Sequence, residues 1–270
     1  MKAPPIDTDL VWLDIKGGVA TITLDSPHNR NALSSRLRRD LTRHLQTVDA
    51  DESVRTIILT HSGPVFCSGA DLSEAHDGDP QQATQELIGI LTALLGAGTP
   101  VIAKFAGPAR AGGIGLIAAC DFAVAAPEVT FAFSEVRIGV VPSIISVPLR
   151  LRVAPVALQR LFLTGETFDA ARAAEINLIS DVCPAADLDN RVADLAEQLR
   201  LGAPSALSGA KRLLQPSPEV LRRQFAEMGE LSARYFASPD AKEGVRAFLE
   251  RRPTQWATSP AAGTTPTSIR

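Results

Sequence analysis

The first half of this chain alternates strand patterns with helix patterns, and this alternation restricts the fold more than any other feature. Apolar and β-branched runs predict two strands at 11–16 and 19–24, joined by Gly17 and Gly18 in a tight hairpin turn. Leucines at helical spacing predict a helix from Ser34 to about residue 50, with a serine as its N-cap. Similar patterns predict strands at 55–60, 101–105, 122–125 and 130–133, and helices at 81–95 and 112–119.

From about residue 146 onward the patterns are helical throughout. They predict helices at 155–163, 169–175, 186–200, 204–214, 218–236 and 239–251. Strand–helix alternation followed by helices alone indicates the α/β class, here an α/β core with a helical C-terminal segment. We therefore expect a core over residues 1–200, a helical segment over 201–257, and a disordered tail over 258–270, where small, polar and proline residues dominate.

Composition excludes several classes of protein. The 270 residues are 45% hydrophobic and 21% charged, which is typical of a folded globular chain. The net charge of −3 gives no support for a nucleic-acid or membrane partner. The start of the chain lacks the apolar run of a targeting segment, and no apolar stretch is long enough to span a bilayer. Three cysteines and four scattered histidines predict neither a disulfide framework nor a metal site, so we expect a cytoplasmic protein.

Two glycine-bearing segments follow predicted strands, at 66–72 and 106–116. Glycine at a strand-to-helix turn lets a ligand approach the backbone, and the N–H groups that begin a helix attract negative charge. Close packing of a helix on a sheet would explain the same residues. Neither segment has the glycine spacing of a dinucleotide site, so a nicotinamide cofactor is not expected.

Both segments, in this order and spacing, resemble the enoyl-CoA hydratase/isomerase (crotonase) superfamily, in particular a bacterial enoyl-CoA hydratase-like branch. The resemblance covers most of the chain and implies a spiral of ββα units with a C-terminal helical trimerisation segment. Its other matching motifs are Pro27 with 31–33, then 100–107, 111–121, 131–142, 163–166, 173–179 and 248–256.

The resemblance also implies a site. The backbone N–H groups of Ala70 and Gly112 would form an oxyanion hole for a thioester enolate, and Glu135 would be the acid–base group. The substrate would be an acyl-CoA thioester with no separate cofactor, and the assembly a homotrimer or a dimer of trimers. Contacts with CoA would come from Arg30, Ala32, Leu33, Ser68, Ala70, Asp71, Leu72, Lys211 and Phe248.

Three positions depart from the family pattern. A second glutamate used by family hydratases would fall at Gly115, which leaves a volume that ordered water could fill. Residues 143–148 replace a glycine-rich stretch, so the pocket beside Glu135 should be narrower and more apolar. Arg110 stands where an apolar residue is common, so it could pair with Asp121 or hold a substrate carboxylate.

These residues predict an enoyl-CoA hydratase-type lyase. One alternative is a Δ3,Δ2-enoyl-CoA isomerase that uses Glu135 as its sole proton shuttle, and another is a catalytically weak acyl-CoA-binding protein. The loop 73–80, which contains Glu74, His76, Asp77 and Asp79, could supply a second acid or base. Asp71 is more typical of a turn than of a catalyst, and Cys67 and Cys120 are expected to be small buried apolar residues.

Overall fold

The computed structural model describes residues 9–75 and 79–258, so most of the predicted tail lies outside the described residues. The strands are β1 (Val11–Lys16), β2 (Val19–Leu24), β3 (Thr56–His61), β4 (Val101–Phe105), β5 (Ala109–Arg110), β6 (Phe122–Ala125), β7 (Thr130–Ala132), β8 (Thr167–Asp169) and β9 (Asp181–Val182). The first helices are α1 (Ser35–Asp49), α2 (Pro80–Gly96), α3 (Gly112–Ala119), α4 (Ser143–Arg150), α5 (Pro155–Thr164) and α6 (Ala170–Glu175). The later helices are α7 (Leu188–Arg200), α8 (Pro204–Leu214), α9 (Pro218–Phe236), α10 (Pro239–Leu249) and α11 (Gln255–Thr258). Short 3-10 helices are η1 (Pro27–Asn29), η2 (Leu72–Ala75), η3 (Ser134–Ile138) and η4 (Ala185–Asp187).

A six-stranded sheet runs through the molecule in the order β1-β2-β3-β4-β6-β9. β1 is antiparallel to β2, and each later pair of neighbours is parallel. Gly17 and Gly18 have φ values of 58° and 80°, as the predicted hairpin turn requires. A smaller sheet has the order β5-β7-β8. The chain passes from a strand of the large sheet to a strand of the small sheet and then to a helix, which gives the expected ββα units.

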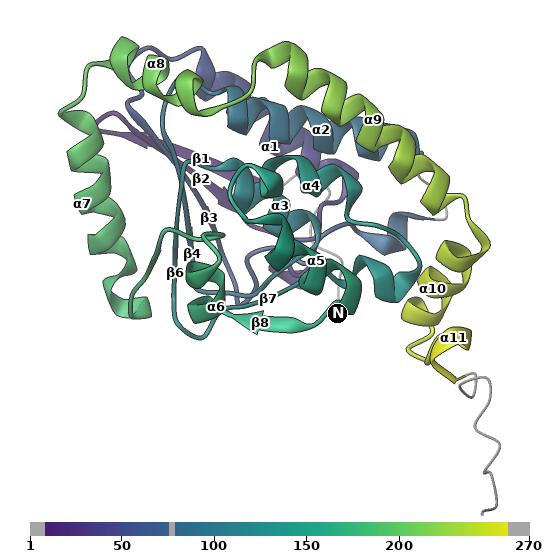
Figure 1. Ribbon diagram of the computed structural model, residues 1–270. Coiled ribbons are helices and arrows are strands. Elements are labelled where there is room, and N and C mark those ends of the chain that lie inside the picture. Colours follow the sequence, from purple (N-terminus) through teal and green to yellow (C-terminus); the bar gives the residue numbers. More distant parts are fainter. Residues whose placement is uncertain (1–8, 76–78, 259–270) are drawn as a thin grey trace, which may run out of the picture.

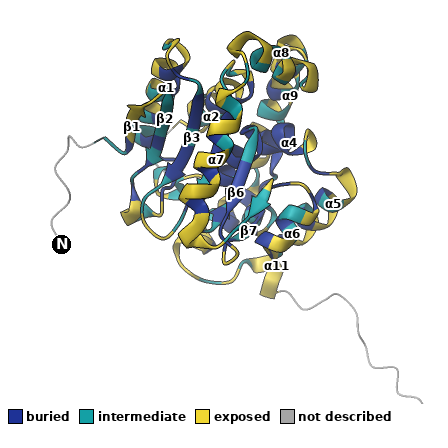
Figure 2. Ribbon diagram, turned by 90° about the vertical axis from the view of Figure 1, so that its left-hand side faces the viewer, coloured by how far each residue is buried: buried dark blue, intermediate teal, exposed yellow. Residues whose placement is uncertain are grey.

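Helices cover the large sheet on both sides (Figure 1). α7 packs against β3, β4 and β6 on one side, and α1 packs against β1 and β2. α9 lies across α2 and α4, and α10 packs against η3. α7, α9 and α10 are therefore in contact with the α/β core, and much of the ribbon of α7 and α8 is coloured as exposed (Figure 2).

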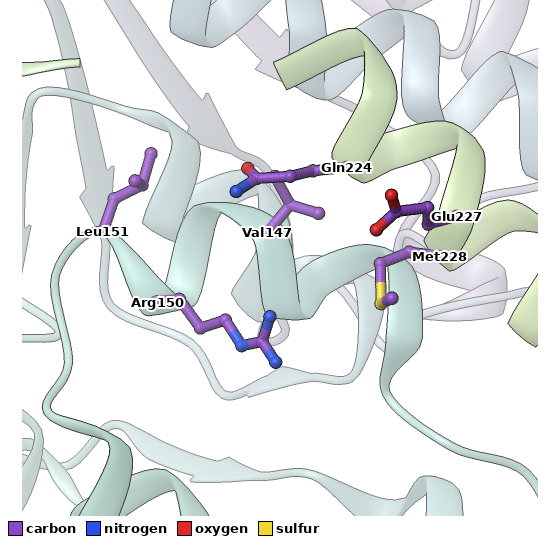
Figure 3. A pocket seen from close by; sticks show the side chains of 6 residues that line it. All are labelled: Val147, Arg150, Leu151, Gln224, Glu227 and Met228. Atoms are coloured by element: carbon purple, nitrogen blue, oxygen red, sulfur yellow. The ribbon is translucent and has the colours of Figure 1, made fainter. Parts of the chain in front are cut away.

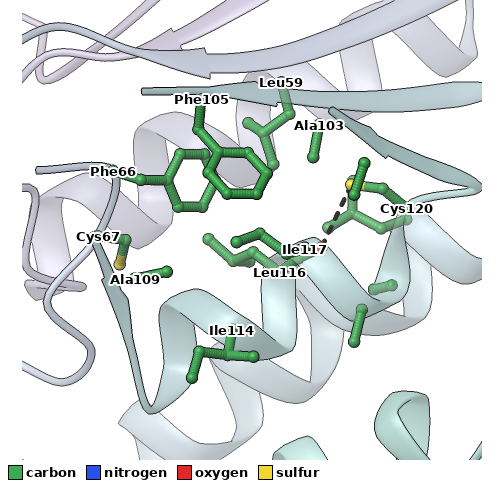
Figure 4. Close-up of a cluster of buried hydrophobic side chains, with 14 of the residues drawn as sticks. Leu59, Phe66, Cys67, Ala103, Phe105, Ala109, Ile114, Leu116, Ile117 and Cys120 are labelled. Carbon is green, nitrogen blue, oxygen red and sulfur yellow. Dashed lines mark hydrogen bonds between the residues drawn. The ribbon is translucent and has the colours of Figure 1, made fainter. Parts of the chain in front are cut away.

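One part of the core lies between the large sheet and α3 (Figure 4). Phe66 and Phe105 are fully packed against each other, with ring centroids 5.2 Å apart, and Leu116 and Ile117 of α3 are fully buried beneath them. Every residue of α3 is buried, as predicted for a helix of small residues enclosed on all sides. Cys67 and Cys120 are buried among apolar neighbours, as expected.

The expectation that only helices follow residue 146 is wrong. β8 pairs antiparallel with β7 and stacks Phe168 on Phe131, and β9 adds a parallel strand beside β6. These strands have three and two residues, too few to produce an alternating pattern. The pattern also missed α4, which begins at Ser143 and contains Pro148, and the two-residue strand β5.

Candidate active site

Three neighbouring segments run in the same direction and lead into the candidate residues. β5 and β7 are parallel neighbours, and Cys67 forms a parallel bridge with β5. Ala70, Gly112 and Glu135 come within a few residues after these three segments. Since parallel segments end at the same edge of a sheet, the fold brings the two predicted N–H donors and the predicted acid–base group to one place.

The turn that begins α3 sets the direction of its first N–H groups. Ala111 has φ 46° and ψ −117°, a strained conformation for a residue with a Cβ atom. Gly69 has φ 89°, and a Cβ built on it would lie 2.9 Å from the Cβ of Ala111 and 3.5 Å from the nitrogen of Gly112. Only glycine allows this close approach, which places the backbone before Ala70 directly beside the start of α3.

The N–H groups of Ala70 and Gly112 donate no hydrogen bond to any residue in the described part of the chain. Gly112 is the first residue of α3, so its N–H has no acceptor within the helix and carries the positive end of the helix dipole. The preceding peptide of Ala70 is fixed, because the N–H of Leu33 donates to the carbonyl of Gly69 at 2.8 Å. Two such groups side by side can bind one negatively charged oxygen.

Glu135 lies in the first turn of η3 and is only 9% exposed. Its Oε2 atom is buried and has no hydrogen-bond partner among the described residues. Burial raises the pKa of this carboxyl from 4.5 to about 7. Near neutral pH both of its protonation states are therefore populated, which is what an acid–base catalyst requires.

Asn31 is a positioning residue whose role the sequence did not indicate. It is fully buried, and its Oδ1 atom accepts from the N–H of Ser26 at 2.6 Å. Its Nδ2 atom donates to the carbonyls of Ser62 and Val65 at 3.0 and 2.8 Å. The side chain thus joins the loop after β2 to the loop after β3, which leads to Ala70.

Most of the predicted CoA contacts form one continuous strip of backbone. Leu33 forms an isolated parallel β-bridge with Ala70, and the N–H of Ser68 donates to the carbonyl of Arg30 at 3.1 Å. The side chain of Leu33 lies over the start of α3, since a Cβ built on Gly112 would be 2.8 Å from its Cδ1 atom. The strip is completed by Ala32, Asp71 and Leu72.

Asp71 is a turn residue, as its position before η2 indicated. Its Oδ1 atom accepts from the N–H and hydroxyl of Ser73 at 3.0 and 2.6 Å. Its Oδ2 atom accepts from Nδ2 of Asn29 at 3.2 Å. Both carboxylate oxygens therefore stabilise the loop rather than facing an open site.

Lys211 does not lie with the other predicted CoA contacts. Its Nζ atom forms an ion pair with Asp121 at 2.7 Å and donates to the carbonyl of Thr99 at 3.0 Å. Asp121 follows the C-terminal end of α3, which is the end opposite Gly112. Phe248, by contrast, lies on α10, which contacts both η2 and η3, and its side chain is 52% exposed.

The side chain of Arg110 hydrogen-bonds within the small sheet and not to an acidic residue of the described chain. Its guanidinium donates to the carbonyl and hydroxyl oxygens of Thr130 at 2.6 and 2.9 Å. The proposed pairing with Asp121 is therefore wrong, because that carboxylate binds Lys211. The contacts tie β5 to β7, and so they fix the two strands that precede Gly112 and Glu135.

The segment 73–80 offers no free acid among its described residues. Glu74 accepts from the N–H of Ser35 at 2.9 Å and so stabilises the start of α1. Asp79 caps α2 by accepting from the N–H of Gln81 at 2.8 Å. His76 and Asp77 lie outside the described residues.

The space next to Gly115 is filled, which corrects the expectation of a volume available to water. A Cβ built on Gly115 would overlap the Cγ2 methyl of Ile145 on α4 and would lie 3.1 Å from its Cβ. Ile145 is 3% exposed. Residues 143–148 thus supply an apolar side chain against α3, and the narrower pocket beside Glu135 stays a prediction. Ser143 is also buried, and its hydroxyl has no hydrogen-bond partner among the described residues.

Other features of the surface do not compete with this site. A small hollow between α4 and α9 contains none of the candidate residues (Figure 3); it is lined by Val147, Arg150, Leu151, Gln224, Glu227 and Met228. Within residues 9–75 and 79–258, no cluster of three or more His, Cys, Asp or Glu side chains could bind a metal ion. No helix in the described ranges has the length and apolar character needed to cross a membrane.

Comparison with known proteins gives one consistent result. The sequence model of the enoyl-CoA hydratase/isomerase family matches residues 14–259. The enoyl-CoA hydratase EchA19 of Mycobacterium tuberculosis is 32% identical over 245 residues, covering 88% of this chain and 92% of the relative. The 2,3-dehydroadipyl-CoA hydratase of Escherichia coli is 32% identical over 238 residues, covering 87% and 93%. A crystal structure of an enoyl-CoA hydratase from Mycobacterium avium is 40% identical, with a TM-score of 0.82, and covers 93% of this chain and 100% of that one.

Proposed function

Because the chain belongs to the enoyl-CoA hydratase/isomerase family, we propose that it adds water to the double bond of a 2-enoyl-CoA thioester. The observation that carries this proposal is Glu135, a buried carboxyl with a pKa of about 7 that follows β7, the parallel neighbour of the strand before Gly112. The N–H groups of Ala70 and Gly112 have no acceptor among the described residues. The relatives named as hydratases support the same reaction class.

The oxyanion hole is the first part of the proposed mechanism. The thioester carbonyl oxygen accepts hydrogen bonds from the N–H groups of Ala70 and Gly112. Water attack at the β-carbon moves electrons onto that oxygen and forms an enolate, which the two donors and the dipole of α3 stabilise. Backbone donors need no reactive side chain, which explains why small residues mark the site.

Glu135 handles the proton in this mechanism. As a carboxylate it accepts a proton from the attacking water while the water oxygen bonds to the β-carbon. As a carboxylic acid it then donates that proton to the α-carbon as the enolate collapses, and the net change is addition of one water. A pKa near 7 suits both steps. CoA is the carrier portion of the substrate, and the strip at residues 30–33 and 68–72 is its proposed contact surface, with Phe248 at its edge.

Double-bond migration is the second candidate, because Gly115 and Ile145 leave Glu135 without a carboxyl partner on α3. In that reaction Glu135 removes a proton from the α-carbon of a 3-enoyl-CoA and returns it to the γ-carbon. A catalytically weak acyl-CoA-binding protein would use the same contacts without turnover.

One screen separates these three functions. The protein is incubated with 2-enoyl-CoA and 3-enoyl-CoA thioesters of several chain lengths, and products are identified by absorbance and mass spectrometry. Hydration consumes the conjugated 2-enoyl absorbance and adds the mass of one water, whereas migration creates that absorbance at unchanged mass. Binding without either change across the whole set would contradict both enzymatic functions.

A further inference from the structure

Arg38 is a buried arginine near the start of α1, and its bonds are directed toward the segment that precedes this helix. It is only 7% exposed. Its Nη1 atom donates to the carbonyl of Leu33, and its Nε atom donates to Oε2 of Glu86 on α2 at 2.7 Å. Helical side chains lean toward the N-terminus, so a residue at 38 can reach back to the chain before α1. The guanidinium therefore holds that chain and α2 together.

Leu33, which Arg38 holds by its carbonyl, controls the direction of one proposed oxyanion donor. The N–H of Leu33 donates to the carbonyl of Gly69 at 2.8 Å. That carbonyl and the N–H of Ala70 belong to one planar trans peptide, so they point in opposite directions. A bond that fixes the carbonyl therefore also fixes the direction of the Ala70 N–H.

The other proposed donor lies against the two segments that Arg38 joins. A Cβ built on Gly112 would lie 2.8 Å from Cδ1 of Leu33 and 4.0 Å from Cδ2 of Leu87. Leu87 follows Glu86 on α2, and α2 packs against both α1 and α3. The bonds of Arg38 thus connect the backbone that carries Leu33 to the helix that carries Leu87, and both leucine side chains contact the start of α3.

The stability of the fold does not by itself account for this buried ion pair. Replacing a buried ion pair by apolar residues of similar volume is often neutral or stabilising, because burial removes both charges from water. A guanidinium differs from an apolar side chain by its rigid planar fork, which directs separate donors at separate acceptors. Here one donor holds Leu33 and another holds Glu86.

We infer that Arg38 is a positioning residue for the oxyanion hole. It acts through Leu33 on the peptide of Ala70, and its ion pair with Glu86 fixes the orientation of the guanidinium itself. This inference rests on the proposed function, in which the N–H groups of Ala70 and Gly112 bind the thioester oxygen.

The test compares Arg38→Met with Arg39→Met as its matched control. Methionine keeps an unbranched side chain and removes the donors, and Arg39 is an exposed arginine at the next position of the same helix. Complete loss of one oxyanion donor costs roughly 10²–10³-fold in kcat, so a misdirected donor should cost less. We expect Arg38→Met to lower kcat for hydration by roughly 10-fold at nearly constant KM, because these bonds strengthen in the transition state. Arg39→Met should leave both constants unchanged.

The carbonyl band of a bound saturated thioester gives a measurement that needs no turnover. Butyryl-CoA, isotope-labelled at its thioester carbonyl carbon, is bound to each variant and its carbonyl stretch is measured by infrared difference spectroscopy. Hydrogen bonds to the oxygen lower this frequency. The band in Arg38→Met should therefore lie at a higher frequency than in the wild type and in Arg39→Met.

Hydrogen exchange in the ligand-free protein gives a second measurement. Arg38→Met should speed exchange of the Leu33 amide, while the amides of α1 beyond its first turn keep their protection. A merely structural role would speed exchange throughout α1. Arg38→Lys keeps the charge without the planar fork, so it should show the same changes to a smaller extent, and it decides the question if Arg38→Met does not fold.

Three results would overturn the inference. The Arg38 variants could keep the wild-type kcat, carbonyl band and Leu33 exchange, or Arg39→Met could change them equally, or faster exchange could extend evenly over α1. If the wild type turns over neither 2-enoyl nor 3-enoyl thioesters, the proposed function fails instead. The carbonyl band and the exchange of the Leu33 amide would then still decide whether Arg38 positions the peptide of Ala70.

Discussion

Replacement of Glu135 by glutamine changes one atom of the side chain and removes its ability to exchange a proton. If Glu135 is the acid–base group, turnover should fall by roughly 10²–10⁴-fold. Binding of the thioester should change little, because the oxyanion donors belong to the backbone of Ala70 and Gly112. A fall in kcat with a nearly constant KM is therefore expected.

The same substitution has an effect on stability whose sign follows from the pKa. The folded protein holds the carboxyl with a pKa of about 7, against 4.5 in the absence of burial. Between these values the folded state binds more protons than the unfolded state, so Glu135 makes the wild type less stable as pH rises from about 4.5 to 7. The free energy of unfolding falls by about 3 kcal/mol in total, and this loss is constant at higher pH.

Glutamine lacks this titration. The buried amide adds a penalty for unpaired donors, but that penalty does not depend on pH. The melting temperature of Glu135→Gln relative to the wild type should therefore rise by roughly 5–10 °C between pH 5 and pH 8. Differential scanning calorimetry at both pH values measures this quantity without any assumption about the substrate.

Wild-type kcat/KM should rise with pH through about 7, because the carboxylate form must accept the first proton. The reasoning would be refuted by a Gln variant that keeps wild-type turnover on the true substrate. A melting difference that is equal at pH 5 and pH 8 would refute the raised pKa independently of activity.

Three further outcomes are expected. Gly112→Pro should remove one oxyanion donor and lower kcat by roughly 10²–10³-fold, with circular dichroism confirming an intact fold; a folded and fully active variant would exclude this donor. Lys211→Ala should remove the ion pair with Asp121 and the hydrogen bond to the carbonyl of Thr99 and cost roughly 1–3 kcal/mol in urea unfolding, while KM for acyl-CoA stays constant; a large rise in KM would place Lys211 in the CoA site. Leu213 and Leu214 are 87% and 85% exposed on α8, and light scattering should find a trimer or hexamer in which such residues are buried; a monomer at micromolar concentration would contradict this.

The sequence predicted those elements whose pattern is local. β1, β2, β4, α3 and β6 have the predicted bounds, because the strands are short apolar or β-branched runs and α3 is a run of small apolar residues that follows a glycine turn. β8 and β9 could not be predicted in this way, because pairing with β7 and β6 creates them and their own residues do not. α4 was missed for a different reason: Pro148 breaks its pattern, and burial on all sides stabilises it in spite of that proline.

The residues of the candidate site also differ in whether a local motif predicts them or a distant contact places them. Ala70, Gly112 and Glu135 could be named from motifs, and the parallel run of β5, β7 and Cys67 brings them together. Lys211 could not be placed from its motif, because its position depends on Asp121, which is far away in sequence.

The packing around Gly115 is the feature of the candidate site that the sequence could least predict. A glycine in place of a longer residue predicts empty space, but whether that space stays empty depends on what packs across from it. Ile145 lies thirty positions later and fills it. The two departures from the family pattern, at Gly115 and at 143–148, are therefore linked, since Ile145 in this position requires glycine at 115.

α10 of the C-terminal segment packs closely against the turn that carries Glu135. A Cβ on Gly244 of α10 would overlap the backbone of Ile138, and a Cβ on Gly139 would overlap the backbone of Asp240. Both contacts are between main chains, so α10 lies as close to the turn of Glu135 as two backbones can approach. Because burial raises the pKa of Glu135, whatever holds α10 against η3 also helps to set the proton affinity of this carboxyl. Glu243 on α10 binds Arg252 at 2.7 Å and Arg246 at 2.8 Å, which ties α10 to the chain that follows it.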